Sequence, residues 1–254
     1  MYQPERQKRL LDIARQEGRV SVASASAEFC VVPETIRRDL DQLAAKGLLR
    51  RVHGGAIPAD FDQLGDTSVD ARDISAVEDK EAIAQAALDY LPAPGGSIIL
   101  DAGTTTRRLA SKFLEEARYT VFTDSAPIAA LLAARTACDV RLIGGRLRGT
   151  TQATVGNATE FAQLRVDVSF MGTNGLSLRH GLSTPDVDEA ASKAAMIAAA
   201  RQVVVLTDSR KIGAESTKRF ATVEDIDVLI TDRGIPGRQH EELTKAGVEV
   251  VLAD

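Results

Sequence analysis

Apolar residues near the start of the chain recur at three- and four-residue steps, the spacing of one buried helical face. Three such stretches are followed by a short apolar strand and a glycine turn. Three helices and a hairpin within about 55 residues predict a winged helix-turn-helix. The expected elements are helices over 4–17, 21–29 and 33–47, a strand over 48–52 and a turn at Gly54-Gly55.

The third of these helices has an outer face that suits nucleic acid. Ile36 and Leu40 share its buried stripe, whereas Arg38 points away from that stripe and Arg37 lies on its flank. Two outward arginines fit the major groove of DNA, with the basic hairpin on the backbone beside it; a solvated helix face is the alternative. The expected DNA contacts are Thr35, Arg37 and Arg38 on the helix, and Arg51 and His53 on the hairpin.

From residue 75 onward, short apolar strands alternate with helices, a pattern typical of a mostly parallel sheet covered on both faces. The expected strands are 97–101, 119–123, 139–143, 166–171, 203–207, 227–231 and 248–252, and the expected helices are 76–91, 104–114, 127–134 and 188–200.

The pattern also divides the chain. Residues 58–74 carry five aspartates and no usable periodicity, which predicts a linker. The sequence therefore predicts an α/β protein with a winged helix-turn-helix domain over 1–57, the linker over 58–74, and a Rossmann-like effector domain with a mostly parallel sheet over 75–254.

The segment IILDAGTTT, residues 98–106, is the best candidate for chemistry in the second domain. A strand ends near Asp101, and three hydroxyl groups stand where a helix begins. Backbone N–H groups at a helix N-terminus, together with hydroxyls, form an anion pocket that suits a phosphate; a capping cluster without a ligand is the alternative. The expected phosphate contacts are Gly103, Thr104, Thr105 and Thr106.

Glycines, carboxylates and lysines recur after other strands of this domain, and open α/β sheets bind ligands outside the carboxyl ends of their strands. Lysines can meet the charge of a phosphate, and carboxylates can accept hydrogen bonds from sugar hydroxyls. The alternatives are an ordinary surface pair for Glu189 and Lys193, four residues apart, and solvation for Arg146. The further expected ligand contacts are Asp101, Gly145, Arg146, Asn174, Gly175, Asp186, Glu189, Lys193 and Lys211.

The net charge of −5 is unevenly distributed, with +3 over residues 1–55 and −8 over the rest. A basic head on an acidic body suits a protein of which only the head approaches phosphate backbones. No apolar run long enough to cross a membrane and no export signal are visible. Cys30 and Cys138 fall in different predicted domains, which favours a reducing cytoplasm over a disulfide framework. The histidines lack metal-ligand spacing, so neither a metal nor a cofactor is expected.

The segments ETIRRDL and GLLRRVHGG resemble the N-terminal domain of the DeoR family of bacterial transcriptional regulators. DAGTTT, GGRLR, FMGTNG, GLSTPD and the spaced Glu189 and Lys193 resemble the effector domain of that family, in the same order, so the resemblance covers nearly the whole chain. It implies a sensor domain similar to ribose-5-phosphate isomerase and glucosamine-6-phosphate deaminase. It also implies that phosphorylated sugars bind at these loops of the regulator and release it from DNA. The positions that the resemblance carries over are Asp101, Thr104, Thr105, Asn174, Asp186, Glu189 and Lys193.

Four positions depart from the family pattern. Cys30 stands where Gly or Asn commonly makes the turn, and Val32 stands where Ser or Thr commonly caps the recognition helix. The lost cap is expected to cost about 1 kcal/mol. Asp124 replaces a common Asn, and Asn174 replaces a common Asp, which we expect to alter the choice of sugar.

These observations predict a ligand-responsive repressor of carbohydrate-metabolism genes. It is expected to bind double-stranded operator DNA as a homo-oligomer, a dimer or a tetramer, and to be released by a phosphorylated sugar. A coupling of about 1–3 kcal/mol between the two sites gives that release. One alternative is a sugar-phosphate isomerase-type enzyme with a DNA-binding head, which the head and Asn174 disfavour because an amide cannot act as a base. A nonspecific DNA-coating protein is disfavoured by the acidic body.

Overall fold

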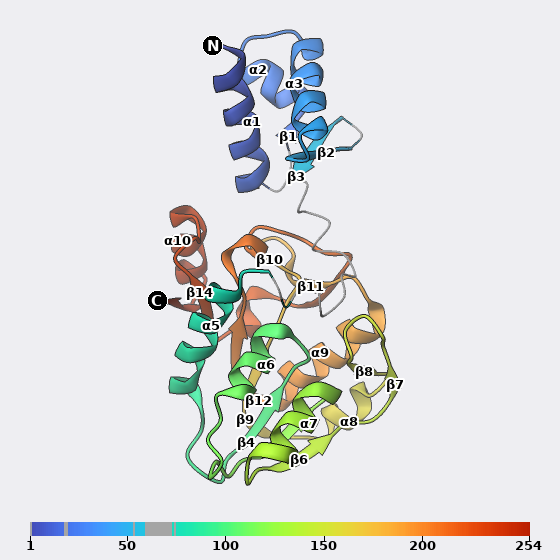
Figure 1. Cartoon of the computed structure of the whole chain (residues 1–254), viewed down its shortest axis with the longest axis vertical. Helices are drawn as coiled ribbons and strands as arrows, with labels where there is room; N and C mark the ends of the chain where they lie inside the picture. The colour runs from blue at the N-terminus through green and yellow to red at the C-terminus, as the bar shows by residue number, and fades with distance from the viewer. Residues whose placement is uncertain (1, 18–19, 53, 59–72, 74) are drawn as a thin grey trace. The chain divides into compact units, whose positions relative to one another are not determined.

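The chain forms two compact units, Met1–Gly65 and Asp66–Asp254, in the computed structural model shown in Figure 1. The structure describes residues 2–17, 20–52, 54–58, 73 and 75–254. The predicted linker over 58–74 therefore lies outside the described residues, apart from Pro58 and Asp73.

The N-terminal unit contains the three predicted helices and the predicted hairpin. Strand β3 pairs antiparallel with both β1 and β2, so a short strand before the second helix joins the hairpin. Leu10, Ile36 and Leu40 are fully buried in a core that this unit forms by itself. The unit is a winged helix-turn-helix. Its elements are α1 Gln3–Glu17, β1 Val20–Ser21, α2 Val22–Glu28, α3 Pro33–Ala45, β2 Leu49–Val52 and β3 Gly55–Pro58.

The ends of α3 have the features that the sequence predicts. Val32 occupies the N-cap in an extended conformation, and its side chain makes no capping hydrogen bond. At the other end Gly47 has φ of 69°, and the N–H of Leu48 donates to the carbonyl of Leu43 at 3.0 Å. In the turn before α3, Cys30 has φ of 53°, a left-handed conformation that glycine adopts more easily.

Val32→Ser is expected to stabilise this unit by about 1 kcal/mol, because a hydroxyl at the N-cap accepts a hydrogen bond from the first helical turn. Val32 is 65% exposed, so little buried apolar surface is lost. Hydrogen exchange of the α3 amides in the full chain measures the effect, with Val32→Ala as the control. Equal protection in the two variants would contradict the prediction.

The second unit is built on a seven-stranded sheet in which every adjacent pair of strands is parallel. The order of the strands reverses between β4 and β9, which is where ligands bind in open sheets of this kind. The predicted parallel sheet is confirmed. In spatial order the strands are β15 Glu249–Ala253, β14 Val228–Asp232, β12 Ala200–Leu206, β9 Val166–Met171, β4 Ser97–Leu100, β5 Thr120–Thr123 and β6 Asp139–Leu142.

Helices cover both faces of this sheet, because successive apolar side chains of each strand point to opposite sides. Ile98 and Leu100 of β4 pack in a core with α5, α6 and α7. Ile99, between them, packs in a second core with α8, α9 and α10. The bounds are α5 Val77–Ala86, α6 Thr104–Ser111, α7 Ala126–Arg135, α8 Ala158–Ala162, α9 Val187–Ala199 and α10 Gly237–Lys245.

Several elements were absent from the prediction. A small antiparallel sheet is formed by β10 Gly175–Ser177, β11 Gly181–Thr184 and β13 Lys218–Ala221, and a hairpin by β7 Arg146–Leu147 and β8 Thr154–Val155. These strands are too short to show an alternating pattern. Helix α10 buries one large apolar residue, Leu243, and α8 buries Phe161, so neither produces a clear stripe. The helix predicted over 76–91 is shorter, since α5 gives way to a 3₁₀ turn at Ala87–Tyr90.

Candidate functional site

The outer face of α3 presents the two arginines that the sequence singled out. The side chains of Arg37 and Arg38 are 53% and 77% exposed. Both form ion pairs with Glu34, which lies 3.2 Å from Arg37 and 4.0 Å from Arg38 on the same exposed face. Thr35 is half-buried at the start of the helix. This face is available to the major groove without disturbing the core.

The inner side of α3 is fixed to α1 by a buried polar cluster. Asp39 is 1% exposed and pairs with Arg6 of α1. The amide nitrogens of Gln3 and Gln7 donate to the other carboxylate oxygen of Asp39 at 3.3 and 3.2 Å. Buried charges need such partners to offset the loss of hydration. The helix that carries the arginines is therefore held rigidly against its neighbour.

The predicted contacts on the hairpin differ from those on the helix. Arg51 is half-buried, lies 2.9 Å from Asp41 of α3, and donates to the carbonyl of Gly55 at 2.9 Å. These contacts fasten the hairpin to the helix, so Arg51 has to exchange a partner to reach DNA. His53, the other predicted hairpin contact, lies outside the described residues.

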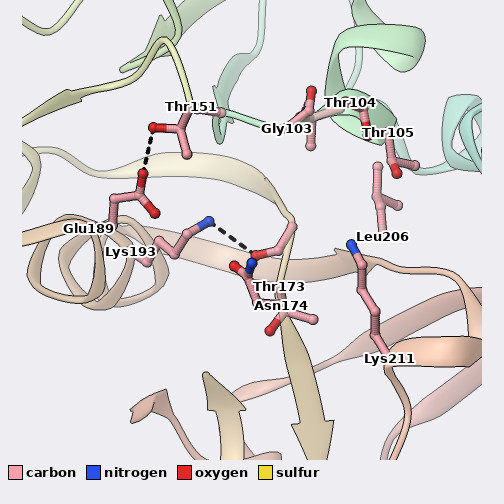
Figure 2. A pocket seen from close by; sticks show the side chains of 13 residues that line it. Gly103, Thr104, Thr105, Thr151, Thr173, Asn174, Glu189, Lys193, Leu206 and Lys211 are labelled. Atoms are coloured by element: carbon pink, nitrogen blue, oxygen red, sulfur yellow. Dashed lines mark hydrogen bonds between the residues drawn. The ribbon is translucent and has the colours of Figure 1, made fainter. Parts of the chain in front are cut away.

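In the second unit, a hollow opens at the carboxyl ends of β4, β9 and β12, where the strand order reverses (Figure 2). Segments from five separate parts of the chain form its wall, and hydroxyl, amide, carboxylate and ammonium groups point into it. Its lining residues are Ala102, Gly103, Thr104, Thr105, Thr106, Thr151, Gly172, Thr173, Asn174, Glu189, Lys193, Leu206 and Lys211.

One wall of the hollow is the N-terminus of α6. Gly103 is the N-cap and supplies no side chain, so the first N–H groups of the helix lack a side-chain cap. Within the part of the chain that the structure describes, the hydroxyls of Thr104 and Thr105 make no hydrogen bond. Thr106 differs, because its hydroxyl donates inward to the carbonyl of Asp101 at 2.7 Å. The first two hydroxyls and the helix end have the donor chemistry that suits an anion.

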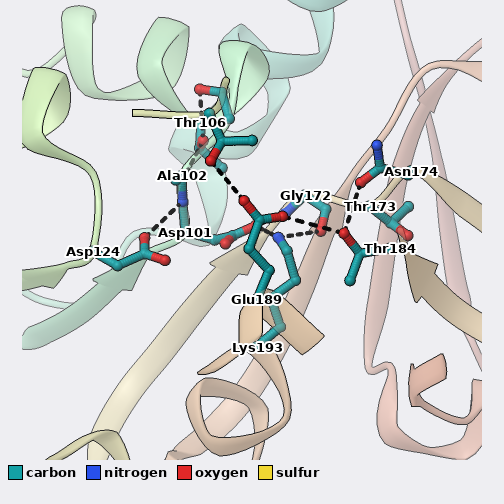
Figure 3. Close-up of polar contacts among 12 residues, drawn as sticks. Asp101, Ala102, Thr106, Asp124, Gly172, Thr173, Asn174, Thr184, Glu189 and Lys193 are labelled. Carbon is teal, nitrogen blue, oxygen red and sulfur yellow. Dashed lines mark hydrogen bonds and ion pairs between the residues drawn. The ribbon is translucent and has the colours of Figure 1, made fainter. Parts of the chain in front are cut away.

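The floor of the hollow contains a buried ion pair (Figure 3). The Lys193 ammonium contacts Oδ2 of Asp101 and donates to the carbonyl of Gly172 at 3.1 Å. Burial raises the pKa of Asp101, while Lys193 and the N–H of Gly172 oppose that shift. Oδ1 of Asp101 is buried without a hydrogen-bond partner among the described residues. Lys193 therefore offsets the charge of a carboxylate that would otherwise be strongly disfavoured.

Asp124, one of the departures from the family pattern, lies beside this pair. Its Oδ1 accepts the N–H of Ala102 at 3.0 Å. Burial and the nearby charge of Asp101 raise the pKa of Asp124 well above its ordinary value. The shift favours the neutral, protonated acid, which can both donate and accept a hydrogen bond.

Glu189 and Lys193 do not pair with each other, although they are four residues apart on α9. Oε1 of Glu189 contacts Arg148 and accepts the hydroxyl of Thr151 at 2.6 Å, and Oε2 accepts the hydroxyl of Thr184 at 3.3 Å. Glu189 is buried yet still borders the hollow. The interpretation of these two residues as an ordinary surface pair is wrong, because each has a separate buried partner of opposite charge.

Lys211 approaches the hollow from the segment after β12 (Figure 2). It lies 3.9 Å from buried Asp208, whose other carboxylate oxygen accepts Nε of Arg210 at 2.8 Å. Burial by itself would raise the pKa of Asp208, but Lys211, Arg210 and Lys80 together hold that pKa below its usual value. Asp208 thereby orients basic side chains next to the proposed anion site.

Lys80 of α5 is almost fully buried near these groups, and its Nζ lies 3.4 Å from the hydroxyl of Ser75. Burial, followed by the charge of Lys211, lowers the pKa of Lys80 to about 8. Between this value and the ordinary 10.5, the unfolded chain binds more protons than the folded chain. The free energy of unfolding should therefore rise with pH over this window, because the cost of a buried ammonium disappears.

The test of this pH dependence compares wild type with Lys80→Met. We expect the stability of wild type to rise relative to that of the variant as pH increases from 8 to 10.5. Urea unfolding followed by circular dichroism measures both proteins, and groups that titrate in both cancel in the difference. Parallel stability curves would show that Lys80 titrates normally.

The remaining predicted ligand residues lie around the hollow rather than on its wall. Gly145 has φ of 146°, and a Cβ there would lie 2.3 Å from the carbonyl oxygen of Val155, so its role in the structure is to begin the β7–β8 hairpin. Arg146 is exposed and lies 2.9 Å from Asp188. Asp186 caps α9, accepting the N–H of Glu189 at 2.9 Å, and Gly175 begins β10.

Some residues of the wall were not predicted. Thr173 belongs to the recognised FMGTNG segment but was not selected, and Asn174 beside it accepts the hydroxyl of Thr184 at 3.2 Å. Thr151 reaches the hollow only because the β7–β8 hairpin folds back toward α9. Nothing in the local sequence of Thr151 signals that return.

Two negative findings hold for the described ranges of the chain. They contain no group of three or more histidine, cysteine, aspartate or glutamate side chains arranged to bind a metal ion. None of the helices described has the length and apolar character needed to cross a membrane.

Comparison with known proteins covers both units. Residues 6–60 match the model of the DeoR-like helix-turn-helix domain, and residues 75–233 match that of the DeoR C terminal sensor domain. The HTH-type transcriptional regulator GlpR of Haloferax volcanii is 37% identical, over 99% of this chain and 98% of that protein. The glycerol-3-phosphate regulon repressor of Escherichia coli is 30% identical, over 99% of this chain and 100% of that protein.

A solved structure of ribose 5-phosphate isomerase A from Methanocaldococcus jannaschii is also similar to this chain. It is 18% identical with a TM-score of 0.40, over 54% of this chain and 55% of that one.

Proposed function

The chain belongs to the DeoR family of transcriptional regulators, and on that premise we propose that it represses genes of carbohydrate or glycerol phosphate metabolism until a phosphorylated ligand releases it from its operator. The regulator that the sequence predicts is confirmed by relatives that match along the whole chain. Those relatives are regulators, so the isomerase-type enzyme is not retained.

One observation carries the choice of ligand. The uncapped N-terminus of α6 presents the hydroxyls of Thr104 and Thr105 to the same hollow that Lys211 borders. A helix end, free hydroxyls and a nearby ammonium together suit a phosphate group. Glu189 and Asn174, farther along the wall, are suited to the hydroxyl groups of the attached carbon chain.

The name of the Escherichia coli relative, a glycerol-3-phosphate regulon repressor, supports a small phosphorylated polyol as the effector class. A sugar phosphate offers the same phosphate with more hydroxyl groups. Both are therefore candidates for this hollow.

The DNA side of the proposal rests on the outer face of α3. Arg37 and Arg38 would contact bases or phosphates in the major groove, with Thr35 at the start of the helix, and Arg51 would contact the backbone after leaving Asp41. A symmetric dimer or tetramer would place two such helices on paired half-sites.

The experiment is fluorescence anisotropy with a DNA fragment from upstream of the gene that encodes this protein. Protein is titrated at fixed salt, and the complex is then challenged with sn-glycerol 3-phosphate, ribose 5-phosphate, glucose 6-phosphate and their unphosphorylated forms. Release by a phosphorylated compound alone supports the proposal. Specific binding that none of them relieves would argue against this effector class.

Thr105→Val is expected to preserve operator binding and to lower the affinity for the effector by about 10- to 150-fold, since a hydrogen bond to a charged group contributes about 1.5–3 kcal/mol. The change keeps the shape of the side chain and removes its hydroxyl. The shift of the effector concentration needed for half-release measures the effect.

Thr207→Val is the matched control, because the Thr207 hydroxyl is buried without a partner among the described residues. It should leave the half-release concentration unchanged. If Thr105→Val also responds as wild type does, the phosphate is bound elsewhere.

A further inference from the structure

We propose that Arg148 is a positioning residue that fixes Glu189 to recognise the hydroxyl groups of the effector, and so determines which phosphorylated compound is accepted. The inference rests on the proposed function and adds the element that sets ligand choice. Arg148 does not border the hollow; it acts through Glu189, which does.

The contacts of Arg148 are buried and converge on the start of α9. The residue follows β7 in the β7–β8 hairpin and is 8% exposed. Its Nη1 contacts Oε1 of Glu189, and its Nε lies 3.4 Å from Oδ2 of Asp186, the N-cap of α9. Thr151, three residues further along the hairpin, donates to the same Oε1 at 2.6 Å. One oxygen of Glu189 is thus held by the hairpin from two directions.

This arrangement separates the two charged residues of α9. Side chains four apart on a helix are neighbours, and Glu189 is the nearest anion on its own helix for Lys193. Arg148 forms an ion pair with Glu189, while Lys193 forms an ion pair with Asp101. Each buried carboxylate therefore has its own cation, and Oε2 of Glu189 accepts the hydroxyl of Thr184 at 3.3 Å.

The chemistry assigns Glu189 to hydroxyl groups rather than to phosphate. A carboxylate accepts hydrogen bonds and repels a phosphate, whereas the α6 N-terminus and Lys211 attract one. A site with a placed acceptor rejects a ligand that lacks the matching donor, because the buried polar group is then left unpaired. The position of Glu189 should therefore set how strongly an organic phosphate is preferred over inorganic phosphate.

The same hairpin supplies a matched control. Arg146 lies 2.9 Å from Asp188, which is also in the first turn of α9, but both side chains are more than half exposed. Exposed pairs contribute little. Arg146→Met removes the same charge from the same hairpin without disturbing a buried carboxylate.

Isothermal titration calorimetry tests the proposal with sn-glycerol 3-phosphate, ribose 5-phosphate, glucose 6-phosphate and inorganic phosphate. The readout is the ratio of the Kd for inorganic phosphate to that for the best organic phosphate. Because both ligands carry phosphate, the ratio cancels most of the change in net charge. Wild type and Arg146→Met should show a Kd ratio above about 10. In Arg148→Met and in Glu189→Gln this ratio should fall by about tenfold or more.

The double variant Arg148→Met with Glu189→Gln distinguishes positioning from general destabilisation. It restores charge balance, so it also serves if Arg148→Met alone fails to fold. If Arg148 acts through Glu189, the double variant has the ratio of Glu189→Gln alone. Two outcomes would overturn this inference and leave the proposed function standing. One is an unchanged Kd ratio in Arg148→Met, and the other is a loss in the double variant equal to the product of the two single losses. No preference for any organic phosphate in wild type overturns the proposed function as well.

Discussion

Replacing Arg37 and Arg38 together by alanine is expected to reduce operator binding to the level of nonspecific DNA, a loss of at least about 10³-fold. Sequence is read by side chains that reach base edges, and arginine to guanine is the commonest such contact. Both side chains are exposed and pair with the exposed Glu34, so the core of the N-terminal unit should remain intact.

The measurement is anisotropy with an operator fragment and with a scrambled fragment of equal length, at one salt concentration. Arg233→Ala with Arg238→Ala is the control, because it removes two exposed arginines from the other unit. Effector affinity should be unchanged in both double variants. An arginine-free α3 that still prefers the operator would show that another surface reads the sequence.

Lys193→Met is expected to lower the free energy of unfolding by about 3–5 kcal/mol and to abolish the effector response. The loss follows because Asp101 is fully buried and would keep a carboxylate without its cation. Urea unfolding followed by circular dichroism measures the stability, and anisotropy of the operator complex measures the response.

A second variant separates the two effects of Lys193. Asp101→Asn with Lys193→Met removes both charges and should recover at least half of the lost stability, without restoring the response to a phosphorylated ligand. If Lys193→Met proves as stable as wild type, Asp101 is protonated in the folded protein and does not form an ion pair with Lys193.

The sequence predicts the parallel sheet and the exposed outer face of α3 well, because both depend on local patterns. The apolar runs of β4 and β12 and the stripe of Ile36 and Leu40 are visible in a few consecutive turns. The strand and helix expected around IILDAGTTT are likewise observed, and its threonines line the hollow.

The partners within the site depend on contacts between distant segments. Helical spacing pairs Glu189 with Lys193, but the structure gives Glu189 to Arg148 and Lys193 to Asp101. The pair of Glu189 with Arg148 requires the short β7–β8 hairpin to turn through Gln152, which has φ of 54°, and no periodic pattern predicts such a turn. Gly145 and Asp186 were also predicted as ligand residues, and the structure places them at a tight turn and at the N-cap of α9.

The strand order also has a consequence for how the protein is made. All contacts of the N-terminal core lie within residues 10–56, and cores of low sequence separation fold quickly. The central strand β4 instead pairs with β9, so Ile98 cannot pair with Val168 until β9 has been synthesised. The hollow likewise cannot form before Lys193 and Lys211 have been synthesised. Because domains fold from the N-terminus as they emerge from the ribosome, a nascent chain acquires its DNA-reading surface well before it has anything with which to sense a ligand.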